Sequence, residues 1–162
     1  MNVSVAERVR AKTEDILARF DLYSGHLHFP RDWGERPVRA WMGVEVFRDI
    51  LAWPLERIVF GEMFDLLLID SGLNPRVYVE TKAPRTLTRE KQIDKILKKA
   101  VDLARLYPTI DQVLVTDAIR WIRFDVKRNL SWHATIRSDQ REWLETLTNL
   151  EGADYPLLRL CR

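Results

Sequence analysis

Apolar positions with helical spacing mark two segments in the first third of the 162-residue chain. Over residues 4–19 the apolar side chains fall along one stripe, and Ser4 and Glu7 have the separation of a capping box, which predicts a helix. Residues 21–40 contain glycines and prolines without a sustained period, which predicts a loop. The stretch 43–52 then returns to helical spacing. We therefore expect two helices joined by an irregular segment.

The middle of the chain changes to short runs rich in β-branched and apolar residues, which predict strands at 56–60, 63–69 and 76–82. The turn-forming sequence DSGLNP separates the last two runs, so they should form a hairpin. The remaining pattern predicts a helix at 88–106, strands at 111–116, 119–125 and 130–136, and a final helix at 139–150. This order predicts a mixed α/β domain with a central sheet flanked by helices.

Composition indicates one soluble, cytoplasmic domain over residues 1–162. The chain is 46% hydrophobic and 31% charged, and it contains no run of the roughly 18 apolar residues that a membrane helix needs. The single cysteine, Cys161, excludes an internal disulfide and a thiolate metal cluster.

Charge is concentrated in one segment although the formal net charge is only +2. Residues 82–99 hold seven lysines and arginines against two acidic residues. Such a cluster suits a groove that faces phosphates, and a solvated helix face gives the same pattern.

Two acidic side chains are expected to face each other in the predicted hairpin. Glu80 and Lys82 lie two positions apart on one face of a strand. If Ile69 stands opposite Arg76, then Asp65 stands opposite Glu80, with Cβ atoms about 5 Å apart. Carboxylates at that distance need a cation, which is either Lys82 in a salt-bridge cluster or a bound Mg²⁺ ion.

The spacing from Asp65 to the sequence Glu80-Thr81-Lys82 resembles the PD-(D/E)XK motif of nucleases. The surrounding sequence VYVETKAP resembles the N-terminal nuclease domain of type I restriction motor subunits and of related fused restriction-modification enzymes. Gln92 on the following helix and the later segment LVTDAIRWIRF extend the resemblance, which spans residues 43–125.

The sequence departs from the family pattern at two places. Phe64 stands where the motif has its proline, and Asp117-Ala118 stands where Asn-Gly or Asp-Gly is expected in the later hairpin. The second departure leaves the geometry of that turn open.

The resemblance implies a restriction-endonuclease-like core over about residues 43–136 and a set of site residues. Asp65 and Glu80 would bind Mg²⁺, for which Mn²⁺ substitutes, with the carbonyl of Thr81 and an upstream acid as further ligands. Glu45 is the expected upstream acid, in competition with Glu56 and Glu62. Lys82 and Gln92 would orient the attacking water. The lysines of the following helix would contact the DNA backbone: Lys91, Lys95, Lys98 and Lys99.

The function that the resemblance implies is metal-dependent cleavage of double-stranded DNA in restriction or phage defence. Dimerisation on DNA is expected, and so are additional motor, methyltransferase or specificity domains, because the chain ends at YPLLRLCR without a convincing terminus. Two alternatives remain open: a catalytically degenerate domain that binds DNA or a partner, and a structural module whose charges neutralise each other.

Overall fold

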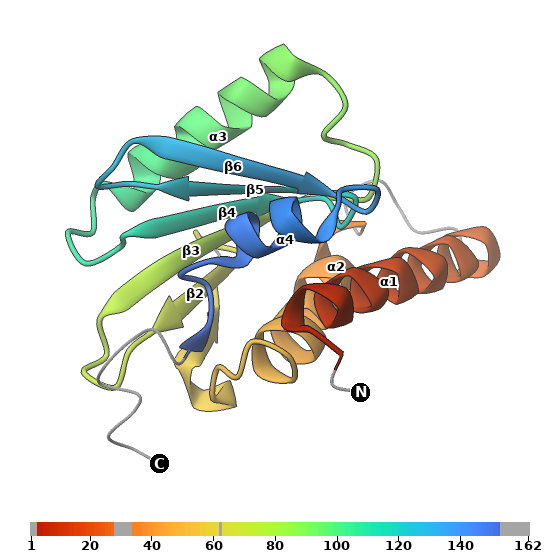
Figure 1. Ribbon diagram of the computed structural model, residues 1–162, viewed down its shortest axis with the longest axis horizontal. Coiled ribbons are helices and arrows are strands. Elements are labelled where there is room, and N and C mark those ends of the chain that lie inside the picture. The colour runs from red at the N-terminus through yellow and green to blue at the C-terminus, as the bar shows by residue number, and fades with distance from the viewer. Residues whose placement is uncertain (1–2, 28–33, 62, 153–162) are drawn as a thin grey trace.

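The computed structural model describes residues 3–27, 34–61 and 63–152, which fold around a six-stranded sheet (Figure 1). The helical elements are α1 (Val5–Leu27), α2 (Glu35–Trp41), the π-helix η2 (Met42–Arg48), the 3₁₀ turn η3 (Leu55–Arg57), α3 (Glu90–Ala104) and α4 (Gln140–Leu147). The strands are β1 (Ile58–Phe60), β2 (Leu66–Ile69), β3 (Pro75–Thr81), β4 (Gln112–Thr116), β5 (Arg120–Asp125) and β6 (Leu130–Thr135).

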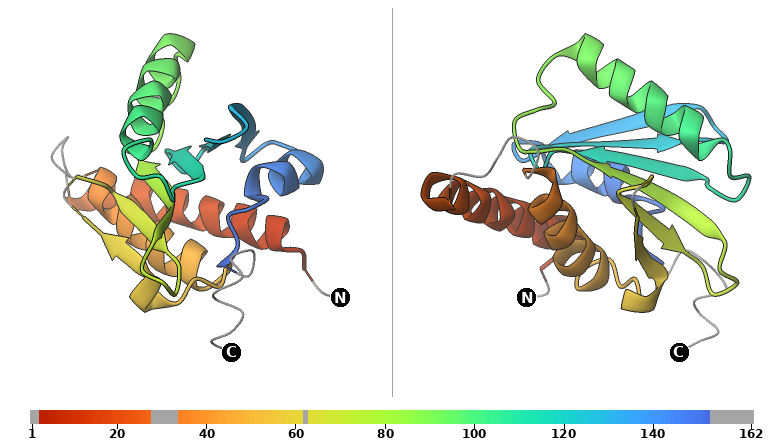
Figure 2. Two further views of the ribbon diagram at one scale, coloured as in Figure 1. Left: turned by 90° about the vertical axis from the view of Figure 1, so that its left-hand side faces the viewer. Right: turned by 180° about the vertical axis from the view of Figure 1, so that it is seen from behind.

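The sheet is mixed, and its strands lie in chain order from β1 to β6. All neighbouring strands are antiparallel except β3 and β4, which are parallel and are connected through α3. In Figures 1 and 2, α3 lies on one side of the sheet, and α1, α2 and α4 lie on the other. The predicted α/β class, with a mixed sheet flanked by helices, is confirmed.

Side-chain alternation along β3 assigns its residues to two cores. Val77 and Val79 are fully buried with the apolar residues of α1, α2 and α4, whereas Tyr78 is buried with those of α3. Because the alternation continues, Glu80 lies on the α3 side and Thr81 is buried on the other. The end of β3 therefore presents a carboxylate beneath α3.

The register of the β2–β3 hairpin is the one predicted over most of its length. Leu66 pairs with Val79, which places the preceding residue of β2 beside the end of β3. The prediction that Ile69 pairs with Arg76 is wrong, because Ile69 pairs with Pro75 across a register shift.

The turn of this hairpin explains the shift. The carboxylate of Asp70 accepts hydrogen bonds from the backbone N–H groups of Gly72 and Asn74, at 2.9 and 3.0 Å, which tightens the loop by local side-chain bonding. Leu73 completes the turn with a φ of 66°, a left-handed conformation that is unusual for a leucine.

The loop predicted over residues 21–40 is wrong in its described parts. Helix α1 continues to Leu27, and Ser24 donates a hydrogen bond back to the carbonyl of Phe20 at 2.7 Å. Helix α2 occupies 35–41 and tolerates Pro37 because the first turn of a helix has no partner for its N–H groups. Residues 28–33 lie outside the described part of the chain.

The second predicted helix exists but is not regular. It continues directly from α2 as η2, so the segment that was expected to begin at residue 43 is the second half of a longer helical run. No helix among the described residues has the length and apolar character that crossing a membrane requires.

One residue in the turn between β4 and β5 adopts a left-handed backbone conformation, although the turn has no glycine. Ala118 has a φ of 70°, and its neighbour Asp117 accepts hydrogen bonds from the N–H groups of Ile119 and Arg120. The second oxygen of Asp117 accepts a bond from the N–H of Leu87 at 3.0 Å. Asp117 therefore joins this turn to the segment that leads from β3 into α3.

Candidate active site

A cavity of about 600 Å³ lies between the start of α2, the β2–β3 hairpin and one face of α3. Six residues that the sequence analysis selected line this cavity: Asp65, Glu80, Lys82, Gln92, Lys95 and Lys99. They come from three separate elements of the fold, so the tertiary structure brings them together.

Asp65 immediately precedes β2 and is fixed to the end of β3. Its Oδ2 accepts hydrogen bonds from the backbone N–H of Thr81 at 2.7 Å and from the hydroxyl of Thr81 at 3.1 Å. Its Oδ1 accepts a hydrogen bond from Arg39. Burial and the negative charge of Glu80 raise the pKa of Asp65, and the bonds from Thr81 and the charge of Arg39 offset only part of that increase.

Both carboxylate oxygens of Glu80 also accept bonds from residues two positions away in the sequence. Oε1 lies 2.8 Å from the ammonium nitrogen of Lys82, and Oε2 accepts a hydrogen bond from the hydroxyl of Tyr78. Burial, followed by this hydrogen bond, raises the pKa of Tyr78, so that its hydroxyl remains a donor.

Lys82 is a cation between acidic groups. Burial opposes its positive charge, but the hydrogen bond to Glu80 and the charges of Glu80, Glu35 and Asp65 together raise the pKa of Lys82. In the absence of a metal ion this side chain is therefore protonated at neutral pH and acts as a donor and a positive charge.

Two residues of α2 belong to the site and were missed by sequence reasoning. Glu35 lies 3.7 Å from the nitrogen of Lys82, and Arg39 pairs with Asp65. They are four residues apart, so both lie on one helix face. This spacing was visible in the sequence, but the glycines and prolines around it favoured a loop and concealed the helix.

The lysines predicted to contact DNA divide into two pairs. Lys95 and Lys99 line the cavity together with Gln92, since all three lie on the same face of α3. Lys91 and Lys98 do not line it; both are exposed, and Lys98 forms an ion pair with Asp102 at 2.6 Å.

Glu45 does not join the site, which corrects the expectation for the upstream acid. Its carboxylate pairs with Arg19, at 2.8 Å for one of two contacts, and with Lys12 at 3.5 Å, so η2 turns it toward α1. Of its competitors, Glu56 is exposed in η3 and Glu62 lies outside the described residues. Among the described residues, Glu35 is the acid upstream of Asp65 that lines the cavity.

The donor set in the cavity is compatible with Mg²⁺. No group of three or more His, Cys, Asp or Glu side chains within 3–27, 34–61 and 63–152 is arranged to hold a metal. Mg²⁺, however, usually takes one or two carboxylates and completes its shell with waters and phosphate oxygens. Asp65 and Glu80 are close enough for one charge to raise the pKa of the other, and the cavity has room for the remaining ligands.

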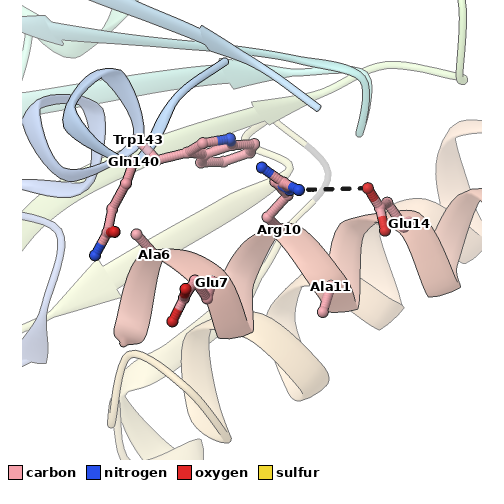
Figure 3. A pocket seen from close by; sticks show the side chains of 7 residues that line it. All are labelled: Ala6, Glu7, Arg10, Ala11, Glu14, Gln140 and Trp143. Atoms are coloured by element: carbon pink, nitrogen blue, oxygen red, sulfur yellow. Dashed lines mark ion pairs between the residues drawn. The ribbon is translucent and has the colours of Figure 1, made fainter. Parts of the chain in front are cut away.

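A second cavity, of about 350 Å³, lies between α1 and α4 (Figure 3). Its charged groups are satisfied locally, because Glu7 caps α1 through Ser4 and Arg10 pairs with Glu14 at 3.9 Å. It contains none of the candidate site residues that the sequence analysis named and no acid without a local partner.

Comparisons of the chain with protein-family models, with curated proteins and with solved structures found no match.

Proposed function

We propose that this chain is a metal-dependent DNA endonuclease with a PD-(D/E)XK active site on a restriction-endonuclease-like core. One observation carries the proposal: the β2–β3 register and the α3 crossover place Asp65, Glu80 and Lys82 in one cavity. An acid pair beside a lysine, recessed and bordered by further lysines, is suited to hydrolysing a phosphodiester.

Asp65 and Glu80 are the residues that would hold Mg²⁺. When bound, the ion lowers the pKa of a water molecule and offsets negative charge on the phosphate. Thr81 orients Asp65 through its backbone N–H and its hydroxyl, and Tyr78 orients Glu80. The carbonyl of Thr81 stays a proposed further ligand.

Lys82 is proposed to position the attacking water and to stabilise charge that develops on the phosphate. Its raised pKa makes it a donor in the metal-free site. Gln92 is proposed to hydrogen-bond the same water. Lys95 and Lys99 are proposed to hold the DNA backbone at the cavity, since phosphate contacts position the nucleic acid without reading its sequence.

The biological setting is proposed from the sequence alone. It is restriction or phage defence in the cytoplasm, with double-stranded DNA as substrate, Mg²⁺ or Mn²⁺ as cofactor and dimerisation on DNA. Motor, methyltransferase or specificity domains are the expected companions.

The direct test is cleavage of supercoiled plasmid by the purified chain in Mg²⁺, Mn²⁺ or EDTA. We expect metal-dependent nicking and linearisation that Asp65→Asn, Glu80→Gln and Lys82→Ala abolish. Glu56→Gln, an exposed acid outside the cavity, is the control and should cut like the unmodified chain. Cutting that persists in EDTA or in Lys82→Ala contradicts the proposal.

A second candidate is a domain that binds DNA without cutting it. It is favoured by the fact that all four carboxylate oxygens of Asp65 and Glu80 already accept bonds from protein donors. Plasmid that is retained in a mobility-shift assay, but never nicked in either metal, would support this candidate.

A further inference from the structure

Arg39 has a contact pattern that the proposed chemistry does not explain. Its ion pair with Asp65 is the one hydrogen bond or ion pair that its guanidinium makes within the described residues. Its Nε is buried and has no hydrogen-bond partner there. Buried donors are nearly always paired in folded proteins, so an unpaired one indicates a missing ligand or a second arrangement of the side chain.

The oxygen that Arg39 contacts is the one a metal ion would need. Thr81 engages Oδ2 of Asp65 twice, which leaves Oδ1 as the less constrained oxygen, and Arg39 occupies it. A guanidinium and a divalent cation repel each other and compete for the same lone pairs. Cation binding at Asp65 therefore works against the Arg39 ion pair.

A displaced Arg39 would remain in a cavity that is lined by further cations. Lys95 and Lys99 line the same cavity, and neither forms an ion pair with another described residue. The planar guanidinium matches the oxygens of a phosphate in a two-pronged contact that a lysine does not make.

We propose that Arg39 is a phosphate-binding residue which Asp65 holds in place until a divalent cation takes over the carboxylate. The inference rests on the proposed function and deepens it. Arg39 opposes cation binding when nucleic acid is absent and favours nucleic-acid binding once the cation is present. The cation and the phosphate thereby bind cooperatively through one side chain.

The test measures both effects without measuring cleavage. The full 162-residue chain and its Arg39→Gln variant are titrated with MnCl₂ by calorimetry, and we expect the variant to bind Mn²⁺ about tenfold more tightly. The same proteins are then titrated with a dye-labelled DNA duplex in CaCl₂, with a gel to confirm that the duplex stays intact. Here the variant should bind about tenfold more weakly.

Opposite changes in the two affinities are the signature of the proposal, because a purely structural ion pair would not produce them. Unchanged affinities, or a loss of both, would overturn it. Circular dichroism checks folding, and if Arg39→Gln does not fold, Arg39→Lys decides. Arg39→Lys keeps a positive charge next to Asp65 but lacks the planar guanidinium group. Mn²⁺ affinity should therefore stay near that of the unmodified chain, while the affinity for the duplex falls. Equality with the unmodified chain in both titrations overturns the proposal.

The outcomes also distinguish a failure of this inference from a failure of the proposed function on which it rests. An unmodified chain that binds no Mn²⁺ and cuts no DNA defeats the proposed function and the inference together. A chain that binds Mn²⁺ and cuts, but whose two affinities do not respond to Arg39→Gln, defeats the inference alone.

Discussion

Asp65 and Thr81 form a two-point contact across the β2–β3 hairpin, in which one carboxylate oxygen accepts both the backbone N–H and the hydroxyl of the threonine. The contact fixes an acid at the start of one strand to the last residue of the next. Because Thr81 is fully buried, the anchor is rigid, and the remaining oxygen of Asp65 has a defined position in the cavity.

The hydroxyl of Thr81 should matter for activity as well as for stability. Thr81→Val keeps the shape of the side chain and removes one hydrogen bond, so the free energy of unfolding should fall by about 1 kcal/mol and plasmid cleavage should slow. Thr81→Ser keeps the hydroxyl and loses a buried methyl group, at about 0.8 kcal/mol, so it should be destabilised similarly but cleave normally. Urea unfolding and plasmid assays on both variants separate the two roles. Equal cleavage by both would show that the hydroxyl is only structural.

The charge on Asp65 should cost stability at neutral pH. The pKa of Asp65 in the folded chain lies above the ordinary 3.8, so folding favours the neutral carboxyl group. The cost in folding stability is therefore absent well below pH 3.8 and grows as the pH rises through the folded-state pKa. Asp65→Asn should therefore stabilise the metal-free chain at pH 7, and the advantage should disappear on acidification. Urea unfolding across pH measures it.

Asp21 serves as a control, because its pKa is shifted in the direction opposite to that of Asp65. A hydrogen bond from Arg85 lowers the pKa of Asp21, so Asp21→Asn should destabilise the chain slightly at neutral pH. Loss of stability in Asp65→Asn at pH 7 would instead show that the ion pair with Arg39 dominates.

Glu35 and Glu45 should differ in their effect on the pH profile of cutting. Removing the charge of Glu35 lowers the pKa of Lys82, so Glu35→Gln should shift the alkaline loss of cleavage to lower pH. Glu45→Gln weakens one of the two carboxylate contacts of Arg19, the other being with Asp15, so it should cost about 1 kcal/mol of stability and leave the profile unchanged. A shifted profile in Glu45→Gln would return the role of upstream acid to that residue.

Two pairs of lysines on α3 test the position of the DNA backbone. The double variants Lys95→Ala/Lys99→Ala and Lys91→Ala/Lys98→Ala lose the same charge, but only the first pair lines the cavity. The first should weaken duplex binding about tenfold more and should reduce the salt dependence by about one unit of slope per lysine. Mobility shifts at several salt concentrations measure this. Equal effects would place the DNA across the outer face of α3.

The strained turn at Leu73 should respond to a residue that tolerates a positive φ. Leu73 is 69% exposed at a φ of 66°, so Leu73→Asn should raise the free energy of unfolding by about 1 kcal/mol. Leu106 is 71% exposed and is not among the residues with a positive φ, which makes Leu106→Asn the matched control that should bring no gain. Thermal unfolding compares the two.

Local patterns were sufficient for most of the fold. The capping pair that begins α1, the alternation along β3 and the helical period of α3 depend on neighbours in the sequence, and they were predicted correctly. The segment that contains α2 was predicted wrongly. Its glycines and prolines favour a loop locally, whereas burial of Val38 against the sheet, with Pro37 in a first turn that needs no N–H, makes it helical.

The sequence by itself determined that Glu80 and Lys82 are side by side and that Asp65 lies next to them across the hairpin, because strand alternation and the pairing of adjacent strands are local properties. Only the tertiary structure decided which other residues meet them. Packing of α2 and η2 on the sheet brings Glu35 and Arg39 to the cavity and pairs Glu45 with Arg19 on α1. These contacts join segments that lie far apart along the chain. Which of the contacts form depends on the pairing of opposite charges in a buried site, and no local sequence pattern encodes that pairing.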